Sequence, residues 1–337
     1  MMPQSCWLTL IVLGGSTALA AAADVAAGQA TQLARIAGRG SLRRAYDRRD
    51  QAHAALRPWQ RGLLDAIALQ GAQYPSAPVS ALASGRLEAG AFCMHLELVH
   101  FVTGLDRLNL LLLNGAARVT DEERESLRAV ITKHLLEWDL ELQTLADGTW
   151  SAHASRKLEV VTTCPEAAAV VELESALPRG KDSGSVRRLM TELQMLLHDH
   201  PVNEQRSRRG LPVINAIWPW GSGMSGAVGP AQLPSASGDV PYLRGLYVSS
   251  PQSIHPAPRD CAALLQSVES TARAVAVIAV EDQAMLEHAW VAPLTGALAA
   301  GRLSRFDLVL DDWRVSIDRS ALRKFWRKAL PPSQWAA

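Results

Sequence analysis

The sequence predicts a mixed α/β protein with a largely doubly covered sheet, and three observations support this fold class. Residues 274–280 are an unbroken apolar run and residues 7–13 are apolar apart from Thr9, a pattern typical of strands buried on both faces. Segments with a helical pattern, such as 121–138, 284–300 and the basic stretch 319–328, alternate with the strands, and the spacing of Thr120 and Glu123 predicts a capping box at the start of the first. Residues 313–317 are expected to pair with the strand 306–310 as a hairpin. The 337 residues are 48% hydrophobic and 20% charged, a globular composition that allows one large or two ordinary domains.

A polar, glycine-containing link at residues 177–184 suggests where two lobes would join. We therefore expect an N-terminal α/β lobe over 1–180 and a C-terminal α/β lobe over 181–337, with one continuous domain as the alternative. Residues 222–241 are rich in Gly, Ser and Pro and have no apolar period, so they predict a flexible loop that acts as a lid.

The N-terminal segment allows two interpretations. Residues 6–23 are apolar and end in alanines, like a secretory cleavage region, but no Lys or Arg precedes Arg35. We favour a buried first strand that turns at Gly14, and hence a cytoplasmic location. As a membrane anchor the run is poor, because residues 14–17 interrupt it.

Charge and cysteine usage exclude several classes of partner. A net charge of +1 predicts no long-range attraction to nucleic acid or to anionic membranes. Five arginines lie between Arg39 and Arg49, but two aspartates offset them, so we expect a solvated face. The four cysteines form no CxxC and no Walker-type loop occurs, so we expect reduced thiols, no zinc site and no cofactor.

Residues 189–223 are the most informative stretch. Leu189, Leu193 and Leu197 form part of an apolar stripe at helical spacing, and Pro201 predicts that this helix ends near residues 198–200. A basic turn, a short strand and a Trp/Gly loop are expected to follow. We expect polar groups at the helix end and a stiff aromatic wall to surround a small-molecule site. The candidate ligand-binding residues are Gln194, His198, Asn203, Glu204, Arg206, Asn215, Trp218, Trp220, Gly221 and Gly223.

The alternative for this stretch is structural: the two indoles fill the core and Asn215 is a buried turn former. His198 and His200 do not form a metal site in either interpretation, because side chains two apart at a helix end do not converge on one ion. On the predicted strand 94–102, His95 and Glu97 share a face and His100 points the other way. This pairing could orient an imidazole as a base, and a plain polar strand face is the simpler account.

Three segments carry a resemblance to a known family. ELQMLLHDHPVNEQRSRRGLPVINAIWPWGSG, from Glu192, resembles the signature segment of a bacterial family described as RpfE-type regulatory or phosphoglycerate-mutase-like proteins. WVAPLTGALAAGRLSRFDLVL from Trp290, followed by SALRKFWRK from Ser320, is similar to the close of that family. MHLELVHFVTGLDRLNLL, from Met94, is a weaker match.

The family in turn resembles the archaeal-type cofactor-independent phosphoglycerate mutases, which use two metal ions and a Ser or Thr nucleophile. This chain departs from that pattern: no carboxylate follows its first strand until Asp24, and no Asp-His-Gly occurs. Two functions therefore remain open. The first is a regulatory protein that lacks the two-metal site and binds a small polar or phosphorylated ligand. The second is an active phosphoryl transferase with an altered site and His198 or His95 as base.

Overall fold

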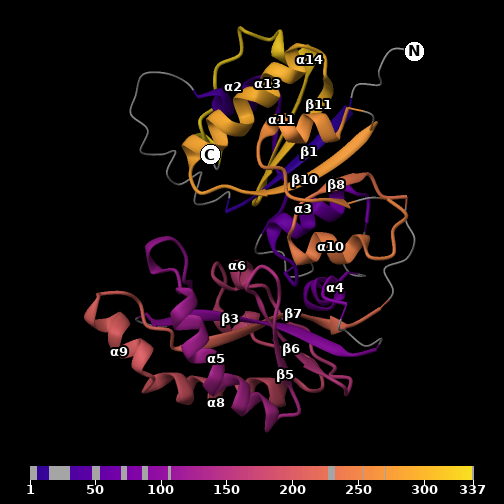
Figure 1. The fold of residues 1–337 in the computed structure, drawn as a ribbon. Helices are drawn as coiled ribbons and strands as arrows, with labels where there is room; N and C mark the ends of the chain where they lie inside the picture. The colour runs from indigo at the N-terminus through magenta and orange to yellow at the C-terminus, as the bar shows by residue number, and fades with distance from the viewer. Residues whose placement is uncertain are drawn as a thin grey trace.

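The computed structural model describes residues 6–14, 31–47, 54–69, 74–85, 90–104, 108–226, 232–252, 254–269 and 271–335. These residues form a seven-stranded sheet and a five-stranded sheet, each flanked by helices, and one sheet lies above the other in Figure 1. The predicted mixed α/β class is confirmed. Within the described residues, no helix is both long and apolar enough to cross a membrane.

The large sheet is built around β1 (Cys6–Leu13), which confirms the predicted first strand. This strand pairs in parallel with β10 (Arg273–Ala279) and with β11 (Leu303–Leu310). Beyond β10 lie β8 (Ser235–Ser237) and β9 (Ile254–His255), both parallel. Beyond β11 lie β12 (Trp313–Asp318) and β2 (Ser41–Arg44), both antiparallel, so the predicted β11–β12 hairpin is also confirmed.

Helices cover both faces of the large sheet, which is why the central strands β1 and β10 are almost entirely apolar. Leu8 and Leu10 of β1 belong to the core of one face, and Ile11 belongs to the core of the other. The first face packs against α2 (Gln32–Arg39), α11 (Cys261–Ser267), α12 (Gln283–Met285), η5 (Leu286–Val291), α13 (Ala292–Ala299) and α14 (Arg319–Leu322). The second packs against α3 (Pro58–Ala66) and α10 (Pro241–Tyr247).

The small sheet is built around the long strand β3 (Phe92–Thr103). On one side β3 pairs with β4 (Leu108–Leu112) and β6 (Trp150–Ala154), and β6 pairs with β5 (Glu141–Thr144). On its other side it pairs with β7 (Ala216–Met224). The remaining helices of this part are η4 (Gly115–Ala117), α5 (Asp121–Leu136), α6 (Pro165–Ala168), α7 (Leu173–Ala176), α8 (Ser183–His198) and α9 (Pro201–Arg208).

Helix α5 begins at the predicted capping box. The Thr120 hydroxyl accepts a hydrogen bond from the Glu123 backbone N–H (3.2 Å), and the Glu123 carboxylate accepts one from the Thr120 N–H (2.9 Å). Leu127, Ile131 and Leu135 then form the buried stripe of α5 and share a core with α8. The local sequence was sufficient to predict α5, because the capping residues and the apolar period both indicate a helix that begins at Asp121.

The two sheets do not divide the chain at residue 180. Strand β1 lies between β10 and β11, which come more than 250 residues later, so the large sheet joins the two ends of the sequence. The small sheet uses the middle of the chain, from β3 to β7. The short helix α4 (Ser76–Leu82) packs against α10 on one side and against β3 and β7 on the other, and it lies between the two sheets in Figure 1.

Four local predictions differ from the structure. Pro201 ends α8 as expected, but it also begins α9 at the first helical position, where a missing N–H costs nothing, so the predicted basic turn follows only after α9, at Arg209 and Gly210. The WPWGSG segment is part of β7 rather than a loop. Pro219 is tolerated there because β7 pairs only with β3 among the described strands, so the ring nitrogen lies at a sheet edge.

The other two differences lie near the C-terminal part of the large sheet. Part of the expected flexible loop 222–241 is ordered, since Ser235–Ser237 forms β8 and pairs with β10; residues 227–231 lie outside the described residues. The expected basic helix over 319–328 is limited to α14, Arg319–Leu322, and the chain then turns.

Candidate functional site

A cavity of about 330 Å³ lies where the two sheets meet. Leu13 and Gly14 reach it from the carboxyl end of β1, and Asp311 reaches it from the carboxyl end of β11. From the small sheet, His95 of β3 and Trp220 of β7 complete it. Ligands of open α/β sheets bind outside the carboxyl ends of the strands, so the topology alone marks this cavity as the candidate site.

Arg57 is the central charged group of the cavity. It is the N-cap residue of α3, and its guanidinium contacts Glu97 at 2.6 Å and Glu166 at 3.0 Å. The same guanidinium lies over the Trp220 ring, 4.5 Å from the centroid. Burial acts to lower the pKa of Arg57, but the carboxylates of Glu166 and Glu97 outweigh it and raise this pKa above its ordinary value. Arg57 therefore stays a cation.

His95 lies beside this cation and is buried. Its ring is 4.6 Å from the Trp220 ring and tilted by 44°. Burial, helped by the positive charge of Arg57, lowers the pKa of His95 to about 3, so the imidazole is neutral at physiological pH. The prediction that His95 and Glu97 share one strand face is confirmed, since Glu97 contacts Arg57 and His95 contacts Trp220, the ring over which the Arg57 guanidinium lies. The His100 ring contacts the Val213 carbonyl instead.

Three buried polar atoms from residues of this cavity have no hydrogen-bond partner among the described residues. They are Nδ1 of His95, Oε2 of Glu166 and Nε1 of Trp220. An unsatisfied buried donor or acceptor costs about 1–3 kcal/mol, and such groups are rare in native proteins. All three atoms belong to residues that line one hollow, which makes this hollow the candidate ligand site.

The charge of the lining limits what that molecule is. Among the described residues that line the cavity, Arg57 is the one cation against three carboxylates, those of Asp147, Glu166 and Asp311. Trp59 and Tyr242 add an edge-to-face aromatic pair with centroids 5.9 Å apart. Because Arg57 is already paired, the cavity favours a neutral or cationic polar molecule with an apolar face over a free anion.

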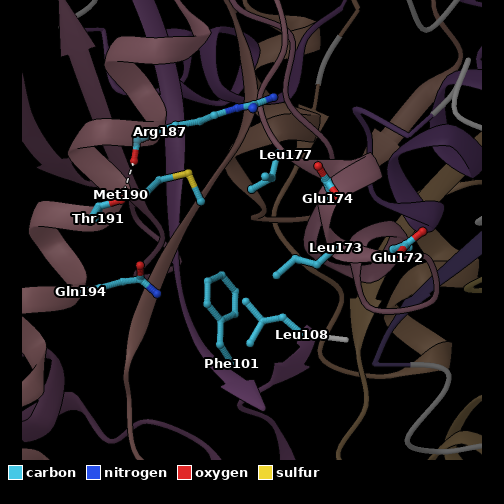
Figure 2. A pocket seen from close by; sticks show the side chains of 10 residues that line it. All are labelled: Phe101, Leu108, Glu172, Leu173, Glu174, Leu177, Arg187, Met190, Thr191 and Gln194. Atoms are coloured by element: carbon cyan, nitrogen blue, oxygen red, sulfur yellow. Dashed lines mark hydrogen bonds between the residues drawn. The ribbon is translucent and has the colours of Figure 1, made fainter. Parts of the chain in front are cut away.

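Two of the ten sequence-predicted residues line a cavity. Trp220 lines the one between the sheets. Gln194 lines a different pocket of about 400 Å³ between α8 and α7, which Figure 2 shows. There Met190 and Gln194 project from α8 toward Phe101 and Leu108. The two residues therefore belong to separate hollows.

Asn203 and Arg206 of α9 are buried structural groups. The Asn203 amide donates to the carbonyls of Leu197 (2.7 Å) and Ile214 (2.8 Å) and accepts from the Ile214 N–H (2.6 Å). It therefore fastens the end of α8 to the chain that enters β7. Arg206 is fully buried and has its own set of protein partners, including Glu123 at 2.7 Å.

The remaining predicted residues also serve the fold or lie at the surface. Asn215 exchanges two hydrogen bonds with the Phe101 backbone, and the Trp218 Nε1 donates to the Thr163 carbonyl at 2.8 Å. Trp218 is therefore a core residue, as in the structural interpretation, whereas Asn215 is half-buried and links the chain before β7 to β3. His198 and Glu204 are exposed, and Glu204 pairs with Arg208.

Gly221 and Gly223 do allow a close approach, but to protein rather than to a ligand. Gly221 has φ +63°, and a Cβ there would lie 2.7 Å from the Ser76 Cβ. At Gly223 a Cβ would lie 2.6 Å from Pro75. These glycines let the start of α4 pack onto β7.

Sequence reasoning missed Arg57, Glu166, Asp147 and Asp311 as lining residues, because tertiary contacts alone bring them together. One signal was available: polar residues such as Asp311 directly follow the apolar strands, and carboxyl ends of parallel strands meet at one edge. The structure was also searched for side chains that could hold a metal ion. In the part of the chain that the structure describes, no three or more His, Cys, Asp or Glu residues are placed to hold a metal ion.

Comparison with known proteins gives a distant relationship. No family model matches this sequence. The chain is 37% identical over 65 residues to a 2,3-bisphosphoglycerate-independent phosphoglycerate mutase from Methanothrix thermoacetophila, and this match spans 19% of the chain and 17% of that relative. Less than a fifth of the relative's length is therefore covered.

Two solved structures are similar over most of their length but at low identity. A cofactor-independent phosphoglycerate mutase from Thermoplasma acidophilum has a TM-score of 0.42 and 14% identity, over 98% of this chain and 94% of that chain. The PH0037 protein from Pyrococcus horikoshii has a TM-score of 0.43 and 11% identity, over 94% of this chain and 88% of that chain.

Proposed function

We propose that this chain is a phosphoglycerate-mutase-like regulatory protein of the RpfE type that binds a small polar ligand between its two sheets. The observation that carries the proposal is the set of unsatisfied atoms, His95 Nδ1, Glu166 Oε2 and Trp220 Nε1, around one cavity. A ligand that offers both donors and acceptors removes this cost when it binds.

The same lining supports an unphosphorylated ligand over a phosphorylated one. A phosphate group needs cations or several backbone N–H groups, and Arg57 is held by Glu97 and Glu166. Binding a phosphate would require Arg57 to leave these carboxylates and would place the new charge near Asp147 and Asp311. Hydroxyl or ammonium groups meet no such penalty.

Matched ligand pairs test this proposal. Thermal melting would be followed with ribose and ribose 5-phosphate, with glucosamine and glucosamine 6-phosphate, and with glycerate and 3-phosphoglycerate. We expect the unphosphorylated member of at least one pair to raise Tm in proportion to its concentration, as linkage requires. A rise only with phosphorylated members would contradict the choice of ligand, and no rise with any of them would contradict the site.

The two indoles provide a matched pair of variants. Trp220→Phe removes the unsatisfied Nε1 while retaining a ring, so we expect weaker ligand binding and unchanged or higher stability. Trp218→Phe removes a donor that is bonded to the Thr163 carbonyl, so we expect lower stability and unchanged ligand binding. Equal effects of the two variants on binding would contradict the assignment of the cavity.

The local match to an archaeal mutase favours a second candidate, an active phosphoryl transferase with an altered site. Of the two histidines considered as base, His95 lies in the cavity and is neutral, whereas His198 is exposed. Interconversion of 3- and 2-phosphoglycerate that is stimulated by manganese, lost on chelation and lost in His95→Gln would support this candidate over the binding protein.

A further inference from the structure

One end of the large sheet carries a dense group of cations around two exposed aromatic rings. We name this group the basic aromatic surface. Its members are Arg323, Lys324, Phe325, Trp326, Arg327 and Lys328. None of its cations has a carboxylate partner among the described residues, whereas arginines of the small sheet such as Arg188 and Arg206 are paired.

The two rings of this surface project outward. The exposed fractions of Phe325 and Trp326 are 77% and 69%. They contact each other edge to face, with centroids 5.4 Å apart. Burying side chains of this size would gain about 1.5–3 kcal/mol each, so two adjacent exposed rings form an apolar knob that the fold itself leaves uncovered.

The chain on either side fixes the position of this knob. Before it, the Asp318 carboxylate caps α14 through the Ala321 N–H at 2.8 Å. After it, Lys328 lies against Gly38 so closely that a Cβ at that glycine would collide with the Lys328 carbonyl. The Leu330 N–H then donates to the Ala34 carbonyl at 2.8 Å. The segment is therefore held to α2 at its end and is presented from a packed base.

A hollow of about 680 Å³ adjoins the knob, between β2 and the segment that contains Lys324 and Arg327. Arg43 and Arg305 also line it, and each pairs with an aspartate. Asp318 is its one carboxylate, and that group is occupied by hydrogen bonds to Ser320 and to the Ala321 backbone, which lower its pKa. The charge of Lys324 also helps to lower the Asp318 pKa, so the hollow keeps the net positive charge of Lys324 and Arg327 against this carboxylate.

We propose that the basic aromatic surface docks this protein onto a bilayer surface that carries anionic lipid. Phe325 and Trp326 enter the headgroup boundary, and the cations around them attract anionic headgroups. The hollow at Lys324 and Arg327 accommodates a headgroup phosphate. The overall charge of +1 does not oppose this contact, because a potential at a membrane is felt within about 8–10 Å and depends on the nearby charges.

The shape of the surface favours a bilayer over two other anionic partners. A single-stranded nucleic acid needs ring faces on which successive bases stack, whereas these rings pack edge to face against each other. An acidic protein segment needs a pocket to receive its own anchors, whereas the apolar part here is a projecting knob. The headgroup region of a bilayer can take up such a knob without a preformed pocket.

Vesicle sedimentation of the full chain tests this proposal. Phosphatidylcholine vesicles with and without phosphatidylserine would be compared at low and at raised salt. We expect binding only with phosphatidylserine, and we expect raised salt to weaken it. The double variants Phe325→Ser/Trp326→Ser and Arg327→Glu/Lys328→Glu should each weaken binding by about tenfold or more.

Matched controls lie on the small sheet. Met195→Ser removes a hydrophobic side chain that is 72% exposed, and Lys133→Glu/Lys181→Glu makes the same change of charge as the second variant. These controls should bind vesicles like the unchanged chain. The proposal is overturned if the chain does not bind phosphatidylserine vesicles, if the controls weaken binding equally, or if a single-stranded oligonucleotide binds more tightly with the same dependence on Phe325 and Trp326.

Discussion

The sequence predicted Arg206 as a ligand-binding residue, whereas the structure gives it a role in holding the fold together. Its guanidinium is fully buried and donates to the Pro212 carbonyl at 2.7 Å, to the Glu123 carboxylate at 2.7 Å and to the Ala117 carbonyl at 2.6 Å. These contacts join α9 to the start of α5. If this role is correct, changing Arg206 alters stability and leaves ligand binding between the sheets unchanged.

The expected magnitude follows from these contacts. Arg206→Met leaves the largely buried Glu123 carboxylate without its nearest cation and leaves two carbonyls without a donor. Removing one partner of a buried ion pair costs about 3–5 kcal/mol. Arg206→Met/Glu123→Leu removes the isolated charge as well, so we expect the double variant to be more stable than the sum of the single changes predicts, by about 2 kcal/mol or more.

Urea unfolding followed by far-UV circular dichroism measures this cycle, with Arg208→Met as a control. Arg208 is exposed and pairs with Glu204 on the same helix, so its change should cost about 0.5 kcal/mol or less. Two results would refute the reasoning: a cost below about 1 kcal/mol for Arg206→Met, or strictly additive single changes. A loss of ligand binding at unchanged stability would restore Arg206 as a binding residue.

Three further predictions concern the cavity and its supports. The pKa of His95 is about 3 in the folded chain and near 6.5 in the unfolded chain. Between these values the unfolded chain binds a proton that the folded chain does not, so the free energy of unfolding falls as pH drops from about 6.5 toward 3. Urea titrations at several pH values should show that His95→Gln reduces this slope by about 1.4 kcal/mol per pH unit. Gly221→Ala combines φ +63° with a clash against Ser76, so calorimetry should show a lower Tm, whereas Gly184→Ala, with open space at its Cβ, should not. Burial raises the pKa of both Cys93 and Cys164 to about 12, so a thiol reagent at neutral pH should label them only after denaturant is added.

The sequence predicted an element correctly where a pattern of neighbouring residues was enough to define it. The apolar run of β1 predicted a buried strand, and the Thr120/Glu123 spacing predicted a helix start. His95 and Glu97 were correctly placed on one face, because strand alternation is a local property. Pro201 was read correctly as the end of one helix but not as the start of the next, since the same missing N–H suits both positions.

The candidate site could not be predicted in the same way. Asn203, Arg206 and Asn215 have the side chains of a polar binding site, and nothing in the local pattern distinguishes an amide that binds a ligand from one that bonds to a backbone carbonyl. Only the pairing of distant strands decides which groups have protein partners. Trp218 and Trp220 illustrate this: two residues apart, one indole has the Thr163 carbonyl and the other has no partner among the described residues.

The sequence by itself determined the class of fold and the main strands and helices, because these follow from periodicity, caps and composition. Only the tertiary structure decided that β1 lies between β10 and β11, and that Arg57 of α3, His95 of β3 and Trp220 of β7 surround one hollow. The physical reason is that the paired strands lie more than 250 residues apart in the sequence. Their pairing depends on how whole apolar faces pack together, and a short stretch of sequence does not show this packing.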